Sequence, residues 1–198
     1  MQEGIRSSEN GMDLKIRYLI DMVSPARLNN DFFVRDVLYV APELIGKTLA
    51  IRSEDDHIRR FIITETEAYR GPEDKACHAS KGRTARTDVM FHEGGKIYVY
   101  FVYGMYWMLN FVAGAKDDPQ AALIRGIEGF NGPGKLTRAI GINKSFYGED
   151  LTSSQRIWVE DTGFHPEYKA GPRIGINYAD EPWKSKSWRY YFEILCSR

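Results

Sequence analysis

The most apolar part of the chain is residues 97–113, with the sequence IYVYFVYGMYWMLNFVA, and it constrains the fold more than any other segment. It falls short of the ~20 residues that a membrane-spanning helix needs, and it contains Gly104, Asn110 and four tyrosines. Aromatic and β-branched residues favour strands over helices. We therefore predict a β-hairpin in which residues 96–103 run outward, a tight turn lies near Gly104, and residues 106–112 return.

Other segments fit the same kind of fold. Strands are predicted at residues 48–52 and 60–69, which flank the polar turn SEDDH, and at residues 121–127, 157–160 and 188–195. Short helices are predicted from Asn30 and Asp31 through Leu38, around Pro42 as far as Gly46, and at residues 135–142. Because there is no internal repeat and no alternating βαβ pattern, we expect one strand-rich domain of mixed structure.

A chain of 198 residues with 43% hydrophobic residues is long enough for a domain that folds without disulfides or a structural metal. Its two cysteines, Cys77 and Cys196, are too few for a disulfide framework or a four-cysteine zinc site. The first residues are rich in acidic side chains and lack the apolar segment of a secretory signal, so we expect a cytoplasmic protein with reduced thiols. We assign residues 1–29 to an N-terminal leader that is partly disordered, and residues 30–198 to the folded domain.

The formal net charge is zero, from 27 basic and 27 acidic residues, which argues weakly against a nucleic-acid partner. The charges are unevenly spread, with net charges of +4 over residues 59–144 and +3 over residues 169–198, against −3 over residues 1–58 and −4 over residues 145–168. Charge alone does not decide between ordinary scatter and a basic surface formed by the two positive segments.

Three residues on a predicted strand, Glu65, Glu67 and Tyr69, alternate with Thr66 and Ala68 and therefore share one face. Their two carboxylates lie roughly 6.5–7 Å apart along such a strand. Two carboxylates beside an aromatic ring suit acid–base chemistry on a glycosidic bond. The spacing by itself favours a simpler interpretation, in which both glutamates are solvated on an exposed strand face.

The sequence GFNGPGK at residues 129–135 has the GxxxxGK spacing of a phosphate-binding loop. Such a loop needs Ser or Thr next to ligate magnesium, whereas Leu136 follows here, and Pro133 removes a backbone N–H. We therefore expect no nucleoside triphosphate site. A glycine-rich turn into a basic helix can still hold a phosphodiester at the helix N-terminus, beside Lys135.

The four histidines, His57, His78, His92 and His165, show no metal-binding spacing, so we expect neither a metal nor another cofactor. His78 lies in the polar segment at residues 71–88, whose length indicates a function. We interpret it as a hydrogen-bonding residue of a pocket.

The same segment carries Lys81, Arg83 and Arg86, close to the tyrosines of the predicted hairpin. Basic side chains interleaved with aromatic ones suit a nucleic acid. The alternative for the tyrosines is core packing, because either face of the hairpin could be buried. Tyr103 is the exception, because it lies near the hairpin tip.

Taken together, these residues resemble the alkyladenine (3-methyladenine) DNA glycosylase family of the mammalian-type fold. The similarity is carried by six strings that occur in the family order: ETEAYRGPEDKACH at 65–78, GRTARTDVMF at 82–91, IYVYFVYGMYWMLN at 97–110, ALIRGIE at 122–128, GPGKLTRAIGINKSF at 132–146 and GPRIGI at 171–176. The resemblance implies a single α+β domain with a mainly antiparallel sheet, flanking helices and a protruding β-hairpin, with residues 30–198 as the catalytic domain.

The resemblance also implies roles for individual residues. Glu67 is similar to the family's general base, and Arg125 to the side chain that helps to hold Glu67 and the catalytic water. The implied walls of the base pocket are Tyr69, His78 and Tyr100, and Asn110 is similar to the substrate-binding residue that rejects guanine. The implied DNA-binding residues are the intercalating Tyr103 and, on the backbone surface, Asn143, Lys144 and Ser145. The basic segment and the glycine-rich turn add Arg83, Arg86 and Lys135 to the predicted DNA-binding residues.

The activity that the resemblance implies is hydrolysis of the N-glycosidic bond of alkylated or deaminated purines in double-stranded DNA, such as 3-methyladenine, 7-methylguanine and hypoxanthine. Such an enzyme flips the base out through minor-groove contacts and leaves the strand uncut. We expect a monomer without metal, associated with the nucleoid if the source is bacterial. Two alternatives stay open: an O-glycosidase that uses Glu65 and Glu67, and a module that binds damaged DNA without catalysis.

Overall fold

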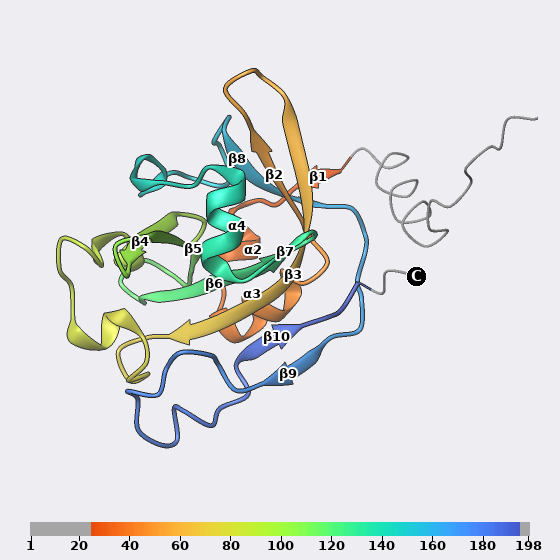
Figure 1. The fold of residues 1–198 in the computed structure, drawn as a ribbon. Coiled ribbons are helices and arrows are strands. Elements are labelled where there is room, and N and C mark those ends of the chain that lie inside the picture. Colours follow the sequence, from red (N-terminus) through yellow and green to blue (C-terminus); the bar gives the residue numbers. More distant parts are fainter. Residues whose placement is uncertain (1–24, 195–198) are drawn as a thin grey trace, which may run out of the picture.

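A computed structural model gives the structure of the protein and describes residues 25–194 (Figure 1). The strands are β1 (Ala26–Arg27), β2 (Thr48–Arg52), β3 (Ile58–Arg70), β4 (Ile97–Val102), β5 (Tyr106–Ala113), β6 (Gln120–Ile127), β7 (Phe130–Asn131), β8 (Ile157–Asp161), β9 (Lys169–Gly171) and β10 (Arg189–Tyr191). The α-helices are α2 (Asn30–Phe33), α3 (Val37–Glu43) and α4 (Pro133–Ile140). Three short 3-10 helices are η1 (His78–Lys81), η2 (Asp88–Phe91) and η3 (Lys144–Phe146).

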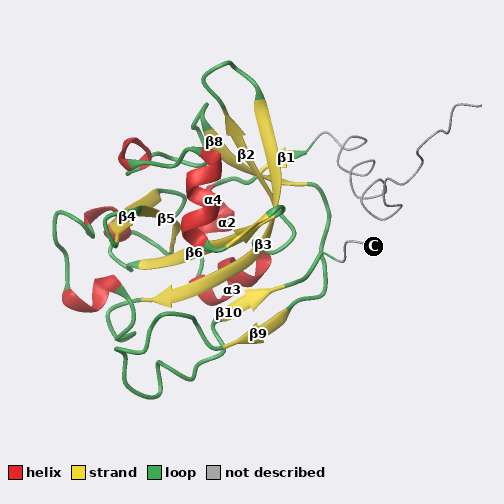
Figure 2. Cartoon of the chain, in the orientation of Figure 1, coloured by secondary structure: helices red, strands yellow, loops and turns green. Residues whose placement is uncertain are grey.

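The strands form one antiparallel sheet in the order β1-β8-β2-β3-β6-β5-β4 (Figure 2). β7 pairs with β6, and β10 lies between β3 and β9. β3 is the longest strand, and its first half pairs with β2 whereas its second half pairs with β6 and β10. This arrangement confirms the predicted α+β class with a mainly antiparallel sheet, and it places the second half of β3 between two neighbours.

β4 and β5 form the predicted hairpin, with Val102 opposite Tyr106 at its end. Tyr103 and Gly104 make the turn with φ of 53° and 65°, and the Met105 amide donates to the Val102 carbonyl at 3.1 Å. The β-turn from Val102 to Met105 therefore has positive φ at both central positions, as in a type I′ turn, and Met105 is the third residue between the paired Val102 and Tyr106. The predicted position of the turn is confirmed, and protrusion of the hairpin stays a prediction.

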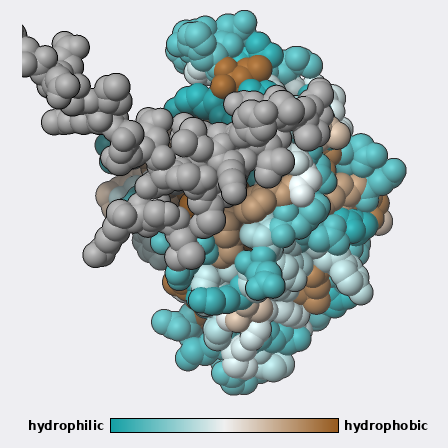
Figure 3. All heavy atoms as spheres, turned by 90° about the vertical axis from the view of Figure 1, so that its right-hand side faces the viewer, coloured by the Kyte–Doolittle hydropathy of each residue, from teal (hydrophilic) through white to brown (hydrophobic). Residues whose placement is uncertain are grey.

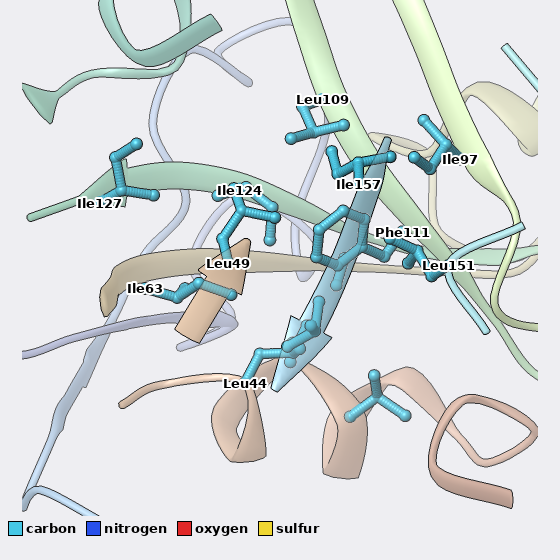
Figure 4. Packing of buried hydrophobic residues seen from close by; sticks show 14 of the residues in the cluster. Leu44, Leu49, Ile63, Ile97, Leu109, Phe111, Ile124, Ile127, Leu151 and Ile157 are labelled. Carbon is cyan, nitrogen blue, oxygen red and sulfur yellow. The ribbon is translucent and has the colours of Figure 1, made fainter. Parts of the chain in front are cut away.

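The main hydrophobic core lies between the sheet and the helices α3 and α4, which pack against β3, β5 and β6. In Figure 4, Leu49 of β2, Ile63 of β3, Phe111 of β5 and Ile124 of β6 converge with Leu44, which follows α3. All five side chains are fully buried. Each such side chain contributes about 1.5–3 kcal/mol when it leaves water, so this cluster stabilises the contact between the sheet and α3.

The helices differ from the prediction in detail. The helix predicted from Asn30 is split into α2 and α3, whose N-caps are Asn29 and Asp36. Pro42 lies inside α3 instead of opening a new turn. α4 begins at Pro133, two residues earlier than predicted, because proline is well suited to the first turn of a helix.

The short strands carry little sequence signal. β1, β7 and β9 contain two or three residues each, and the sequence did not predict them. β10 is shorter than the predicted strand at residues 188–195, the last of which lies outside the described residues. Most of the predicted leader also lies outside them.

The surface turned to the viewer in Figure 3 is mainly hydrophilic, with hydrophobic side chains interspersed. Among residues 25–194 we find no helix whose length and hydropathy would allow it to span a membrane.

Candidate active site

Glu67 lies in the second half of β3, opposite Leu123 of β6 on one side and Arg189 of β10 on the other. Its side chain is fully buried. A buried carboxylate is rare unless other groups compensate its charge. The groups that contact the Glu67 carboxylate therefore determine its charge and its ability to accept a proton.

Three donors reach the Glu67 carboxylate. The Tyr69 hydroxyl donates to Oε2 at 2.8 Å, and the Ile174 amide donates to Oε1 at 2.7 Å. Arg125 Nε lies 3.4 Å from Oε1. A carboxylate offers about four acceptor positions, so one position remains, on Oε2. A water molecule that reached this oxygen could donate a proton to it.

Burial raises the pKa of Glu67 above its usual range, and the nearby Glu65 adds to this effect. Arg125, the Ile174 amide and the Tyr69 hydroxyl oppose it, since each stabilises the charged form. A carboxylate with a raised pKa accepts a proton more readily than an ordinary glutamate does, which suits a general base.

Glu65 is 8% exposed and is held by two guanidinium groups. Its Oε1 accepts hydrogen bonds from Arg125 Nε at 3.2 Å and from Arg189 Nη1 at 3.0 Å. Because Arg125 contacts both Glu65 and Glu67, the two glutamates share one side of β3, as the alternation predicted. The alternative of two solvated glutamates is wrong, because both side chains are buried in the paired half of the strand.

The register between β3 and β6 shifts at this point, where Glu65 lies opposite Gly126. A Cβ atom on Gly126 would lie 2.8 Å from the Thr64 hydroxyl oxygen and 3.1 Å from the Glu65 Cβ. The irregular pairing therefore requires glycine at position 126, directly after Arg125.

Beside Tyr69 lies a cavity of about 30 Å³, which we call the base pocket. It is lined by Tyr69, Ala76, His78, Met90, Tyr98, Tyr100, Asn110, Ala121 and Tyr178. The structure thus brings together Tyr69, His78, Tyr100 and Asn110, the four residues predicted to bind the substrate. The sequence missed Tyr98 and Tyr178 as walls. The sequence shows Tyr98 only as one of several hairpin tyrosines, and no motif points to Tyr178.

His78 is fixed on both sides. Its Nδ1 lies 2.9 Å from the Tyr98 hydroxyl, and its Nε2 lies 3.1 Å from Arg86 Nη2. Its ring packs edge to face on Tyr100, with centroids 4.6 Å apart. Burial, together with the charges of Arg86 and Lys81, lowers the pKa of His78 to about 4. His78 is therefore neutral at physiological pH and acts as a hydrogen-bonding wall of the pocket.

Asn110 is 3% exposed, and its amide nitrogen donates to the carbonyls of Tyr98 and Met108 at 3.1 and 3.3 Å. These two bonds fix the orientation of the side chain in the pocket wall. A rigid amide at such a position can discriminate between bases by what it offers to their edges.

A buried ion pair, which the sequence does not predict, lies next to the pocket. Arg173 donates to both carboxylate oxygens of Asp74, at 2.6 and 2.9 Å, and neither side chain is exposed. Arg173 also donates to the Ala68 carbonyl on β3, and its guanidinium carbon lies 4.7 Å from the centre of the Tyr69 ring. The pair holds the loop that carries Ile174 against β3 and against the segment that leads to His78.

The predicted DNA-binding residues of the hairpin and the basic segment differ in their surroundings. Tyr103 is 86% exposed at the tip of the hairpin. Arg86 lies over the ring of Tyr100, 5.1 Å from its centre, at the edge of the pocket. Arg83 is already paired with Asp88 at 2.8 Å and with a second aspartate, so a phosphate would have to compete for it.

The remaining predicted DNA-binding residues lie on and after α4. Lys135 is exposed in the first turn of α4, and Lys144 is exposed in η3. Asn143 is the N-cap of η3 and accepts a hydrogen bond from the Ser145 amide at 2.8 Å. Ser145 in turn accepts hydrogen bonds from Arg156. Asn143 and Ser145 thus have structural contacts of their own, beside any contact with DNA.

We find no group of three or more His, Cys, Asp and Glu side chains in the described part of the chain that could hold a metal ion. Cys77 is buried next to His78, and burial raises the pKa of its thiol to about 12. The cysteine is therefore a protonated packing residue.

Comparisons with known proteins point in one direction. Residues 31–131 and 128–194 match the family model for methylpurine-DNA glycosylase (MPG). A relative from Rickettsia rickettsii (strain Sheila Smith) is 46% identical over 170 residues, which cover 82% of this chain and 88% of the relative. A relative from Sodalis glossinidius is 44% identical over 174 residues, covering 84% and 99%. A third, from Psychrobacter cryohalolentis, is 39% identical over 199 residues, covering 86% and 92%. All three are provisionally named 3-methyladenine DNA glycosylase.

Proposed function

The chain belongs to the methylpurine-DNA glycosylase family and is therefore a monofunctional DNA glycosylase, and from this premise we propose how its site works. The substrates are alkylated or deaminated purines in double-stranded DNA, such as 3-methyladenine, 7-methylguanine and hypoxanthine. The enzyme hydrolyses the N-glycosidic bond and leaves the strand uncut. Membership in an enzyme family of this class excludes both alternatives, the O-glycosidase and the non-catalytic binding module.

The damaged base enters the base pocket by flipping, because its glycosidic bond cannot be reached inside the base stack. Tyr69 and Tyr100 are aromatic walls of this pocket, and His78 is a neutral one. Many alkylated purines carry a positive charge, and an aromatic face attracts a cation by about 0.5–2 kcal/mol. A neutral His78 adds no repulsion to such a base, which supports this substrate class.

In the chemical step, Glu67 takes a proton from a water molecule while the water oxygen bonds to C1′ of the sugar. The bond from C1′ to the base nitrogen breaks, and its electron pair leaves with the base. A cationic purine leaves as a neutral molecule, whereas a neutral purine such as hypoxanthine must also receive a proton. Arg125 holds Glu67 and offsets the negative charge of the carboxylate before it accepts the proton.

One observation carries this proposal: Glu67 is a fully buried carboxylate with one acceptor position left, directly beside Tyr69, a wall of the pocket. In a protein that only binds DNA, the negative charge of this carboxylate would repel the phosphates. Its burial also lowers the stability of the fold. Its presence is explained if it activates water.

The test compares two isosteric changes on the same strand. Glu67→Gln should keep its affinity for lesion DNA and lose single-turnover excision of hypoxanthine by at least ~10²-fold, the usual contribution of a general base. Glu65→Gln is the matched control and should be much milder, because Glu65 accepts hydrogen bonds from Arg125 and Arg189, whereas Glu67 accepts one from the pocket wall Tyr69. An active Glu67→Gln together with an inactive Glu65→Gln would contradict the proposal. Abasic sites are detected by strand cleavage in hot alkali.

We also propose how the enzyme contacts the DNA around the damaged base. The enzyme binds from the minor groove as a monomer, and Tyr103 fills the gap left by the flipped base. Arg83, Arg86, Lys135 and the turn at Asn143, Lys144 and Ser145 contact the DNA backbone. The exposed tip position of Tyr103 supports this arrangement, since a wedge must reach the base stack before the rest of the protein does.

A further inference from the structure

The proposed function requires a whole purine base to enter the base pocket, yet the pocket is too small for one. Its volume of about 30 Å³ gives room for roughly two water molecules. Pockets for small ligands usually measure ~300 Å³ or more. At least one wall must therefore move before the base can enter.

Most walls of the pocket are held by several contacts. Tyr98 and Asn110 are almost completely buried and hydrogen-bonded. The Tyr69 hydroxyl is bonded to the catalytic carboxylate, and a guanidinium group covers its ring. His78 is contacted on both sides, and the Tyr100 ring packs against it. The remaining apolar walls other than Tyr178 belong to the hydrophobic clusters.

Tyr178 differs from all of these walls. Its side chain is 67% exposed, and its hydroxyl makes one hydrogen bond, to the Ala76 carbonyl at 3.1 Å. The backbone around it is anchored, because Ile176 and Ala179 are buried and the Ala179 amide donates to the Ile176 carbonyl. The ring can therefore rotate about its side-chain torsions while the chain that carries it stays in place.

Tyr178 also lines a second, larger cavity of about 380 Å³. This cavity shares Ala76, His78 and Tyr178 with the base pocket, and Lys81 and Arg86 lie on its other sides. Tyr178 thus lies on the boundary between a small cavity and a much larger one. Rotation of its ring would join the two.

We propose that Tyr178 is the movable wall of the base pocket and that its ring limits the size of the base that the opened pocket holds. The ring turns outward when the flipped base arrives and packs against the base from this outward position. This inference rests on the proposed function, since it assigns a role to Tyr178 only if a base is flipped into the pocket.

Two variants separate the ring from its hydroxyl. Tyr178→Ala removes the wall, and Tyr178→Phe keeps the ring but loses the bond to Ala76. Single-turnover excision is measured on duplexes that contain hypoxanthine or an etheno-adenine, a purine with an additional fused ring. In Tyr178→Ala the ratio of etheno-adenine to hypoxanthine excision should rise by roughly 10-fold or more, the scale on which pocket size discriminates. Tyr178→Phe should keep the ratio of the unmodified protein, because the ring has the same size.

Tyr39→Ala is the matched control, because Tyr39 is also an exposed tyrosine, 65% exposed, but lies on α3 and not in the pocket. It should leave the ratio unchanged. An unchanged ratio in Tyr178→Ala, with excision by the unmodified protein intact, would overturn the inference and leave the proposed function standing. A cooperative loss of the fold in Tyr178→Ala would also overturn it, since a freely moving exposed ring contributes little to stability. If the unmodified protein excised no purine lesion at all, the proposed function itself would fall.

Discussion

Replacement of Tyr103 by asparagine should leave the fold intact, or stabilise it, and yet impair excision. Tyr103 is 86% exposed, and it sits in the left-handed region with φ of 53°. Both facts follow from its place at the first position of the type I′ turn. Asparagine is among the residues that this position prefers, because its short polar side chain tolerates positive φ.

Two opposing effects determine how much this substitution changes the free energy of unfolding. A fully packed tyrosine buries about 150–250 Å². Tyr103 is 86% exposed, so its replacement loses only about one seventh of this buried area. At ~25 cal/mol per Å² the loss lowers the free energy of unfolding by less than about 1 kcal/mol. The left-handed conformation costs an ordinary residue about 1–2 kcal/mol, and asparagine relieves most of this. We therefore expect the free energy of unfolding of Tyr103→Asn to lie between unchanged and about 1 kcal/mol higher. Truncation of a core aromatic residue would instead lower it by about 3–5 kcal/mol.

Two assays decide the outcome. Urea denaturation gives the free energy of unfolding, and single-turnover excision is measured on hypoxanthine in a paired duplex and in a mismatched one. Excision from the paired duplex should fall by roughly 10-fold or more, because nothing then fills the gap left by the base, and each 1.4 kcal/mol lost corresponds to tenfold. The mismatched duplex should suffer less, since the base there is already easier to flip. A destabilisation of more than about 2 kcal/mol would refute the exposed-tip argument, and an unchanged rate on paired DNA would remove Tyr103 from the mechanism.

Two further predictions concern charges around the site. The positive charge of Arg125 lowers the pKa of Glu67. Arg125→Ala removes this charge, so the acid side of the pH–rate profile for excision should move to higher pH. A profile that stays in place would show that Arg125 does not act on Glu67. Arg173→Met leaves the buried carboxylate of Asp74 unpaired, so the free energy of unfolding in urea should fall by about 3–5 kcal/mol, and a fall below about 1 kcal/mol would mean that water reaches Asp74.

The sequence determined the strands and the hairpin, because these depend on local patterns. Alternation of buried and exposed residues, β-branched enrichment and the tip residues Tyr103 and Gly104 act over a few neighbouring positions, and they predicted β2 through β6 close to their observed bounds. The order of six motif strings along the chain was specific enough to predict the family. The short strands β1, β7 and β9 could not be predicted in this way, because a strand of two or three residues exists only through its pairing partner.

Only the tertiary structure decided how the candidate site is built. The same spacing of Glu65 and Glu67 fits a solvated strand face and a buried one, and it was the pairing of β3 with β6 and β10 that removed both from water. The donor to Glu67 from the Ile174 amide is 107 residues away along the chain, and Tyr178, the one pocket wall with a mostly exposed ring, comes from the same distant loop. Burial and long-range contacts set the pKa of a carboxylate and the walls of a cavity. Because they arise from packing between segments far apart in sequence, no local pattern could report them.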